Sequence, residues 1–279
     1  MRIGIVTIPV AAQGGLPSDG PSLLEQVVAL ARDVERLGFH GFWLTDAFAR
    51  GKPTLDPLIL LAALATQTFR IELGTCVVQV PLRHPVEHAH RVQTLNLLTQ
   101  GRLRFGVGSG STKHDFEAVQ ASYDARFKTL PAYLDVMRKV WSGEPVYGPA
   151  LSVWPGTEFG PPVLLGAWRS ERWINLAAKV LQGWIASGIH TSWEDLAIGV
   201  KMYRNAGGKR AVLANIFTDF RNPPGHLPIS HEPKISLFCS PAQARDRLKR
   251  LEDLGIDDAL LVCPWDDLAQ LKTVAALVG

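Results

Sequence analysis

Residues 71–107 read IELGTCVVQVPLRHPVEHAHRVQTLNLLTQGRLRFGV. Short β-rich runs stand at both ends of this stretch, and the residues between them, from position 85 to 98, follow a helical period. A strand, a helix and a second strand in succession form a parallel β-α-β unit. The stretch therefore predicts a parallel sheet that is covered by helices.

The same alternation recurs along the whole chain. We expect strands at 3–8, 41–45, 71–78, 103–107, 163–166, 183–186, 211–215 and 258–262, and helices at 22–37, 57–68, 85–98, 127–141, 171–179, 192–205, 241–254 and 266–277. Glycines follow several helix ends and serines precede several helix starts, as they commonly do. Eight strands that alternate with eight helices close a (β/α)8 barrel, the TIM barrel fold, whose usual length is roughly 250 residues. The 279 residues therefore predict a single domain over 1–279.

The composition excludes several other classes of protein. Hydrophobic residues make up 47% of the chain and charged residues 20%, which suits a packed core and not a disordered chain. The net charge of +3 comes from 29 basic and 26 acidic residues that do not cluster, so we expect no nucleic-acid partner. The apolar start, MRIGIVTIPV, is too short to span a membrane and lacks a signal-peptide cleavage pattern, so we expect a cytoplasmic protein without a membrane partner.

Neither the cysteines nor the histidines indicate a metal site. The cysteines are three in number and have no CxxC spacing, which favours reduced thiols over a disulfide framework or a zinc site. His88 and His90 have the HxH spacing of metal-dependent barrel hydrolases, but they lie on a predicted helix, where residues two apart point in different directions. We predict structural roles for both and no bound metal.

Two connections are unusually long and rich in proline and glycine, namely residues 142–162 and 216–239. Structureless connections of this length in a compact domain are often lids over a functional site. Each is expected to be either such a lid or an ordinary surface loop.

The loop after the fourth strand carries the strongest local signal of a binding site. It runs from position 106 to 113 and reads GVGSGSTK, with Gly108, Ser109, Gly110 and Ser111 at its centre. Glycines allow close approach to the backbone, and the backbone N–H groups, the hydroxyls and Lys113 together suit a phosphate. No helix is expected to begin at once, so a Rossmann dinucleotide site is disfavoured. The alternative is a tight turn at the barrel rim.

The loop after the fifth strand offers a second set of candidates, namely Trp168, Arg169 and Ser170. Ser170 can cap the helix that follows, the N-terminus of that helix favours an anion, and Arg169 adds a full positive charge. Trp168 could stack on a cofactor or line a substrate pocket. The alternative is an ordinary capped helix with a solvated arginine.

Many short motifs along nearly the whole chain resemble the luciferase-like monooxygenase family. The matching segments are Gly38-Phe39, Trp43 to Asp46, Asp56-Pro57, Leu73 to Val78, Pro81 to Pro85, Thr94 to Asn96, Gly101-Arg102, Phe105 to Gly108, Asp115-Phe116, Trp141 to Gly143, Ala177-Ala178 and Gly183-Trp184. The stretch from Gly74 to Gly110 is the most specific part of this resemblance.

The resemblance implies a barrel that binds FMN or, in some branches, the deazaflavin coenzyme F(420) across the strand ends. It implies a non-prolyl cis peptide bond beneath the ring at Cys76–Val77, and it places Asp46 near the ring. Many members have a histidine directly after this acidic residue, whereas this chain has Ala47. The usual acid or base of the family therefore cannot be transferred to this position.

Other side chains near predicted strand ends are candidates to replace the missing histidine. His84 and His114 are the candidate catalytic residues together with Asp46, and Arg83 lies beside His84. Histidine suits proton transfer near neutral pH. Each of these residues could instead form ordinary hydrogen bonds at the barrel rim.

The resemblance favours an FMN-dependent monooxygenase that uses reduced flavin and O2 on a small organic substrate. It also implies a separate flavin reductase as a possible partner and a homo-oligomer, commonly a homodimer. Hydride transfer with the deazaflavin is the first alternative, although no dense basic cluster is present for an acidic coenzyme tail. The remaining alternatives are a flavin-binding protein without catalysis and a metal-dependent hydrolase.

Overall fold

The computed structural model describes residues 1–7, 22–47, 51, 54–221, 232–263 and 268–278. Its strands are β1 (Arg2–Thr7), β2 (Gly41–Leu44), β3 (Glu72–Thr75), β4 (Val78–Gln79), β5 (Leu103–Gly108), β6 (Val163–Gly166), β7 (Gly183–Ser187), β8 (Ala211–Asp219), β9 (Ser236–Phe238) and β10 (Asp258–Val262). Its helices are α1 (Leu23–Arg36), α2 (Pro57–Ala65), the short 3-10 helix η1 (Val80–Leu82), α3 (Pro85–Leu98), α4 (Lys113–Ala118), α5 (Arg126–Trp141), α6 (Glu171–Val180), α7 (Trp193–Asn205), α8 (Pro241–Asp253) and α9 (Leu268–Val278).

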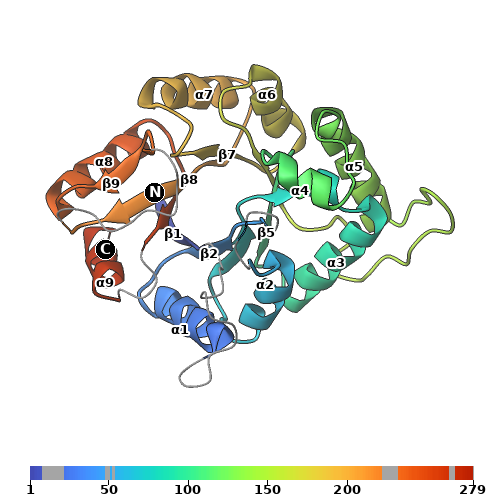
Figure 1. The fold of residues 1–279 in the computed structure, drawn as a ribbon, viewed down its shortest axis with the longest axis horizontal. Helices are drawn as coiled ribbons and strands as arrows, with labels where there is room; N and C mark the ends of the chain where they lie inside the picture. The colour runs from blue at the N-terminus through green and yellow to red at the C-terminus, as the bar shows by residue number, and fades with distance from the viewer. Residues whose placement is uncertain (8–21, 48–50, 52–53, 222–231, 264–267, 279) are drawn as a thin grey trace. The chain divides into compact units, whose positions relative to one another are not determined.

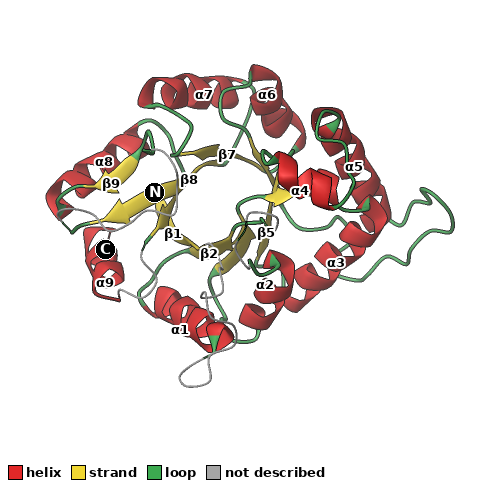
Figure 2. Ribbon diagram, viewed as in Figure 1, coloured by secondary structure: helices red, strands yellow, loops and turns green. Residues whose placement is uncertain are grey.

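The fold is the closed parallel barrel that the sequence predicts. The strand order is β10-β1-β2-β3-β5-β6-β7-β8-β9, and β10 also pairs with β8. Each pair whose register is defined is parallel. Within the described residues, helices lie between successive strands along the chain except between β3 and β4 and between β8 and β9 (Figure 2). Among the helices of the described residues, none combines the length and the apolar character that crossing a bilayer requires.

The chain divides into two compact units. Unit 1 comprises Met1–Thr7, Leu30–Trp43 and Leu164–Gly279, and unit 2 comprises Ile8–Ala29 and Leu44–Val163. The single domain over 1–279 stays a prediction.

Unit 1 is built on the parallel pairs β1–β10, β10–β8, β7–β8 and β8–β9. Helices α6 and α7 lie side by side in this unit (Figure 1). The register of β8 against β10 shifts between Ala259 and Leu261, and Asn215 of β8 has a positive φ of 56°. One extra residue in one strand is a β-bulge, which redirects the side chains around it.

Unit 2 contains the pairs β3–β5 and β4–β5, with α3 packed against α5. The Trp141 indole at the end of α5 is buried and donates a hydrogen bond of 3.0 Å to the carbonyl of Ala89 on α3. The predicted cis bond between Cys76 and Val77 is confirmed. The strand expected at 71–78 is two strands, β3 and β4, and this bond lies between them.

One further expectation is corrected by the structure. The segment 216–239 is not one long loop, because β8 continues to Asp219 and β9 pairs with it in parallel. Its proline and glycine residues concealed the β-rich runs on either side. Residues 222–231 lie outside the described part, and so does residue 8 of the first expected strand. Residues 142–162 contain neither helix nor strand, and their role as a lid stays a prediction.

Candidate active site

One side chain beside the cis bond in unit 2 is partly exposed at the end of a buried strand. Within residues 71–82, Val77 alone is not fully buried. Its Cγ2 atom lies over Gly108, where an added Cβ would come within 2.6 Å of it. The neighbouring Cys76 is buried, and burial raises the pKa of its thiol to about 12, so this thiol is neutral at ordinary pH. Val77 is thus the residue of this segment that a bound ring can contact.

Asp46, which follows β2, ties this segment in place. Its carboxylate accepts a hydrogen bond from the backbone N–H of Gln79 at 2.9 Å and two from the guanidinium of Arg83, at 2.7 and 2.9 Å. The Asp46 side chain is only 3% exposed. Asp46 thus binds a bidentate arginine through both of its carboxylate oxygens. It holds the chain on both sides of the short helix η1.

The network around Asp46 extends to two further carboxylates. Arg83 also reaches the Asp56 carboxylate at 3.5 Å, and the Gln79 side chain donates to the buried Asp115 carboxylate at 2.8 Å. Burial alone would lower the pKa of Arg83, but the hydrogen bonds and charges of Asp46 and Asp56 outweigh it and raise that pKa. Arg83, one of the possible substitutes for the missing histidine, is therefore a fixed cation and not a proton carrier.

The glycine loop after β5 packs closely against this network. Gly110 has a φ of +84°, and an added Cβ there would come within 2.7 Å of the Phe116 ring and 2.8 Å of the Gln79 amide oxygen. That oxygen is buried and has no hydrogen-bond partner among the described residues. Glycine is thus required at position 110 both by the backbone conformation and by the space.

The same loop presents a row of unused hydrogen-bond donors. The hydroxyls of Ser109, Ser111 and Thr112 and the backbone N–H groups of residues 110–114 have no partner within the described part of the chain. Ser111 is exposed and Ser109 is partly exposed. A short helix that was not among those expected, α4, begins at Lys113, five residues after the end of β5. The donors suit a phosphate group.

The two candidate histidines of unit 2 lie outside this network. His84 is exposed at the start of α3, where its ring centroid is 5.8 Å from that of Tyr147. The His114 side chain on α4 is 77% exposed and contacts the Glu117 carboxylate at 2.9 Å. Their catalytic roles stay predictions, to which the structure adds no contact with Asp46.

His88 and His90 occupy structural positions on α3, on different faces of the helix. His88 is fully buried, with its ring centroid 5.6 Å from that of Phe105. His90 is exposed, and its ring lies edge-to-face with the Trp154 ring, with 5.3 Å between the ring centroids. In the described part of the chain, no group of three or more metal-binding side chains comes together.

In unit 1, Trp168 does not stand alone after β6. Its indole stacks on the imidazole of His190, which follows β7, with 3.9 Å between ring centroids. Arg169 is exposed and pairs loosely with the Asp195 carboxylate at 3.7 Å. Ser170 occupies the N-cap position of α6, but its side chain makes no capping hydrogen bond, so the predicted cap is wrong. His190 was missed, although its place just after an expected strand was a usable signal.

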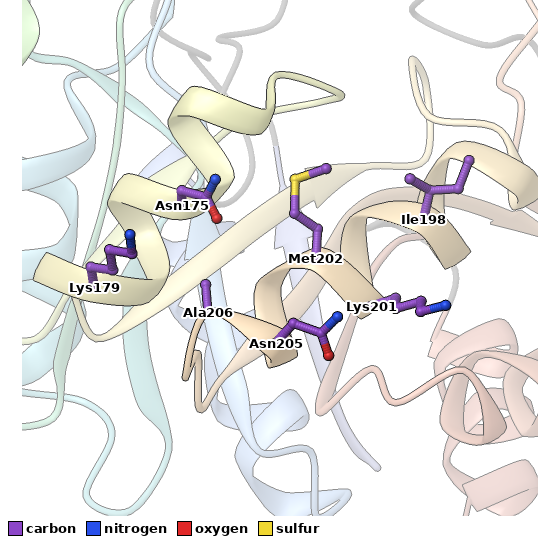
Figure 3. Close-up of a pocket in the computed structure, with 7 residues that line it drawn as sticks. All are labelled: Asn175, Lys179, Ile198, Lys201, Met202, Asn205 and Ala206. Carbon is purple, nitrogen blue, oxygen red and sulfur yellow. The ribbon is translucent and has the colours of Figure 1, made fainter.

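A shallow groove lies between α6 and α7 of unit 1 (Figure 3). It has a volume of about 620 Å³ and is lined by Asn175, Lys179, Ile198, Lys201, Met202, Asn205 and Ala206. These residues belong to the helices and the turn after α7, not to the strand ends, where barrel active sites are built. The groove is therefore not the candidate active site.

Comparison with known sequences identifies related monooxygenases. The family model for luciferase-like monooxygenases matches residues 1–218. Limonene 1,2-monooxygenase from Rhodococcus erythropolis is 35% identical over 131 residues, which are 46% of this chain and 34% of that protein. The chain thus spans about a third of the length of this curated relative.

Solved structures with the same fold come from several enzymes. Monooxygenase RslO1 from Streptomyces bottropensis has a TM-score of 0.84 at 19% identity, over 100% of this chain and 98% of that one. The oxygenating constituent of 3,6-diketocamphane monooxygenase from Pseudomonas putida, in complex with FMN, has a TM-score of 0.75 at 15% identity, over 100% and 96%. An F(420)-dependent secondary alcohol dehydrogenase, in complex with an F(420)–acetone adduct, has a TM-score of 0.75 at 15% identity, over 100% and 99%.

Proposed function

Because the chain belongs to the luciferase-like monooxygenase family, we propose that it is a flavin-dependent oxidoreductase that uses reduced FMN and O2 to oxygenate a small organic substrate. A separate flavin reductase supplies the reduced cofactor, and the protein acts as a homo-oligomer. The limonene monooxygenase relative and the FMN-bound structural neighbour support this choice.

The observation that carries the proposal is the row of unused donors beside Val77. Ser109, Ser111 and Thr112 follow the strand whose last residue, Gly108, lies under the Val77 side chain. Hydroxyl and backbone N–H donors match the oxygens of a phosphate monoester. A partly exposed apolar side chain next to them matches a ring. These residues therefore fit FMN, which carries both groups.

The chain's own residues have separate tasks in this proposal. Ser109, Ser111 and Thr112 hold the phosphate, and Val77 contacts the ring. Asp46 and Arg83 are positioning residues, because their ion pair fixes the segment that carries Val77. When bound, the flavin supplies the electron transfer to O2, and the protein's part is to orient it and to exclude water.

Hydride transfer with the deazaflavin coenzyme is the second candidate. The F(420)-dependent structural neighbour favours it, and the same donors would serve a phosphate of either cofactor. The two candidates differ in their need for O2, which makes them separable by experiment.

The decisive test is a titration of the purified chain with FMN and, separately, with coenzyme F(420), followed by flavin absorbance and fluorescence. We expect saturable FMN binding, and O2 consumption by the loaded protein with chemically reduced flavin. A preference for the deazaflavin would favour hydride transfer, and binding of neither would refute the cofactor site. FMN binding without turnover of any substrate would favour the non-catalytic alternative.

A pair of glycine variants tests the placement of the ring. In Gly108→Ala the new methyl group would lie 2.6 Å from Val77 Cγ2 and displace it, whereas Gly148→Ala meets no atom within 4 Å. We expect the displaced Val77 to cost about 1.4 kcal/mol of FMN binding free energy, so Gly108→Ala should bind FMN about tenfold more weakly. Gly148→Ala should bind FMN as the wild type does. Equal FMN affinities of the two variants would show that Val77 does not contact the bound ring.

A further inference from the structure

A cluster of aromatic and polar side chains in unit 1 is not used by the cofactor site proposed above. Trp168 follows β6 by two residues and His190 follows β7 by three. Their rings are 3.9 Å apart and inclined by only 29°, so the imidazole lies flat against one face of the indole. Trp168 is nevertheless 44% exposed. The stack therefore holds an accessible aromatic surface in one orientation at the end of two strands.

Polar groups accompany the stack at the same strand ends. Ser187, the last residue of β7, pairs in register with Ala214 of β8, beside Asn215. The Asn215 amide donates a hydrogen bond of 3.5 Å to the Ser187 hydroxyl, while its own oxygen accepts none from the described residues. The buried hydroxyl of Thr191, next to His190, also has no partner there. Thr191 is fully buried, so the groups left for a ligand are the Ser187 hydroxyl proton and the Asn215 amide oxygen.

The backbone beneath these groups is packed too tightly to shift easily. An added Cβ on Gly188 would come within 2.8 Å of the Ile235 carbonyl and 2.9 Å of the Asn215 carbonyl. Gly188 itself donates to Ala214 and accepts from Ile235 through backbone hydrogen bonds of 2.7 and 2.8 Å. Asn215 holds a positive φ of 56°, a conformation that asparagine tolerates better than most residues. Such bulges often redirect a side chain beside a functional site.

We propose that Trp168 and His190, with Ser187 and Asn215, bind the substrate of the proposed reaction, and that this substrate is a planar conjugated ring bearing a carbonyl or hydroxyl oxygen. The indole of Trp168 stacks on the face of the substrate ring, and Ser187 and Asn215 form hydrogen bonds with its oxygen. A flat aromatic surface with a few convergent polar groups is the usual make-up of a small-molecule site. The inference rests on the proposed function, since it names the substrate class of that reaction.

The test compares three probes that differ in one property each. α-Naphthol is planar and oxygenated, naphthalene is planar without oxygen, and α-decalol has the oxygen but a saturated, puckered skeleton. Dissociation constants are measured by calorimetry on the chain with and without FMN. We expect α-naphthol to bind about tenfold more tightly than either other probe, as one ring stack or one hydrogen bond would provide.

Three variants assign the difference to residues. Trp168→Leu should bring the α-naphthol affinity down to that of α-decalol, and Asn215→Gly, which keeps the backbone conformation accessible, should bring it down to that of naphthalene. Trp193→Leu removes a partly exposed tryptophan elsewhere in unit 1, on α7, and should change neither.

Several outcomes would overturn the inference. Equal binding of α-decalol and α-naphthol would exclude ring selection. If Trp168→Leu weakened FMN binding and left α-naphthol binding unchanged, Trp168 would serve the cofactor, and the proposed function would stand without this inference. If the chain bound no FMN, the proposed function would fail, while the titrations without FMN would still decide whether the stack selects planar rings.

Discussion

Asp46 has a structural task that the sequence alone does not reveal, and its catalytic role stays a prediction. The family resemblance places it near the ring, and the missing histidine at Ala47 invites a role in proton transfer. In the structure its carboxylate is buried and bound by Arg83 through two hydrogen bonds. The identity of the residue was readable from the sequence, but its partner, 37 positions away, was not.

The substitution Asp46→Asn should destabilise the protein by about 3 kcal/mol, because it leaves the mostly buried Arg83 without its main counter-charge. The free energy of unfolding is measured in urea. Asp33→Asn is the matched control, since it breaks an exposed pair with Arg36 on α1 and should cost less than about 1 kcal/mol. Equal effects of the two substitutions would contradict the structural role of Asp46.

His88 predicts a dependence of stability on pH. Burial, with smaller contributions from the charges of Arg83 and Arg91, lowers the pKa of His88 to about 3. A histidine in the unfolded chain has a pKa of about 6.5, so the unfolded state takes up the proton first. Above about pH 6.5 the group therefore has no effect, and below it the folded state loses about 1.4 kcal/mol per pH unit until about pH 3.

The measurement compares the unfolding free energy of the wild type and of His88→Leu between pH 7 and pH 4.5, a window set by these two pKa values. The variant should gain stability relative to the wild type as the pH falls. His90→Leu on the same helix removes an exposed histidine and should show no such trend. Parallel pH profiles for the wild type and His88→Leu would refute the neutral buried histidine.

At the scale of the element, helix starts show which local signals suffice. A serine precedes both α6 and α8, at positions 170 and 240, and serine is a favoured N-cap residue. Ser240 forms a capping box with Gln243 three residues later, whereas the residue three after Ser170 is Trp173, which cannot return the hydrogen bond. The difference was present in the sequence, since a capping box requires Glu or Gln at that position.

Ser240→Ala should therefore cost about 1 kcal/mol of folding free energy, the usual effect of losing an N-cap. Ser170→Ala removes a hydroxyl that caps nothing and should cost less than half of that. Both are measured by urea unfolding under the same conditions. A larger loss for Ser170→Ala would mean that its hydroxyl has a partner in solution.

At the scale of the whole molecule, the alternation of strands and helices predicted the barrel because hydrophobic periodicity is a local property. Other features depend on pairing between distant segments. The bulge at Asn215 arises from the register of β8 against β10, and the Trp168–His190 stack requires β6 and β7 to pair. The cis bond at Cys76–Val77 was foreseen only through the family resemblance. The sequence therefore indicated which residues belong to the candidate site, but not which residues they contact.

The stability of the whole chain should report whether the glycine loop recognises a phosphate. FMN and riboflavin share the ring and differ in the phosphate, so donors at Ser109, Ser111 and Thr112 should make FMN the more stabilising ligand. A ligand stabilises the folded state according to its dissociation constant, and a tenfold tighter constant adds about 1.4 kcal/mol at equal, saturating concentrations. Thermal unfolding should therefore show a higher Tm with FMN than with riboflavin.

The double variant Ser109→Ala with Ser111→Ala should reduce this difference in Tm between the two ligands. Ser152→Ala, which changes an exposed serine of the same unit, should leave the difference unchanged. If both ligands raise the Tm equally, the loop is a turn that happens to be rich in hydroxyls, and the phosphate must be held elsewhere.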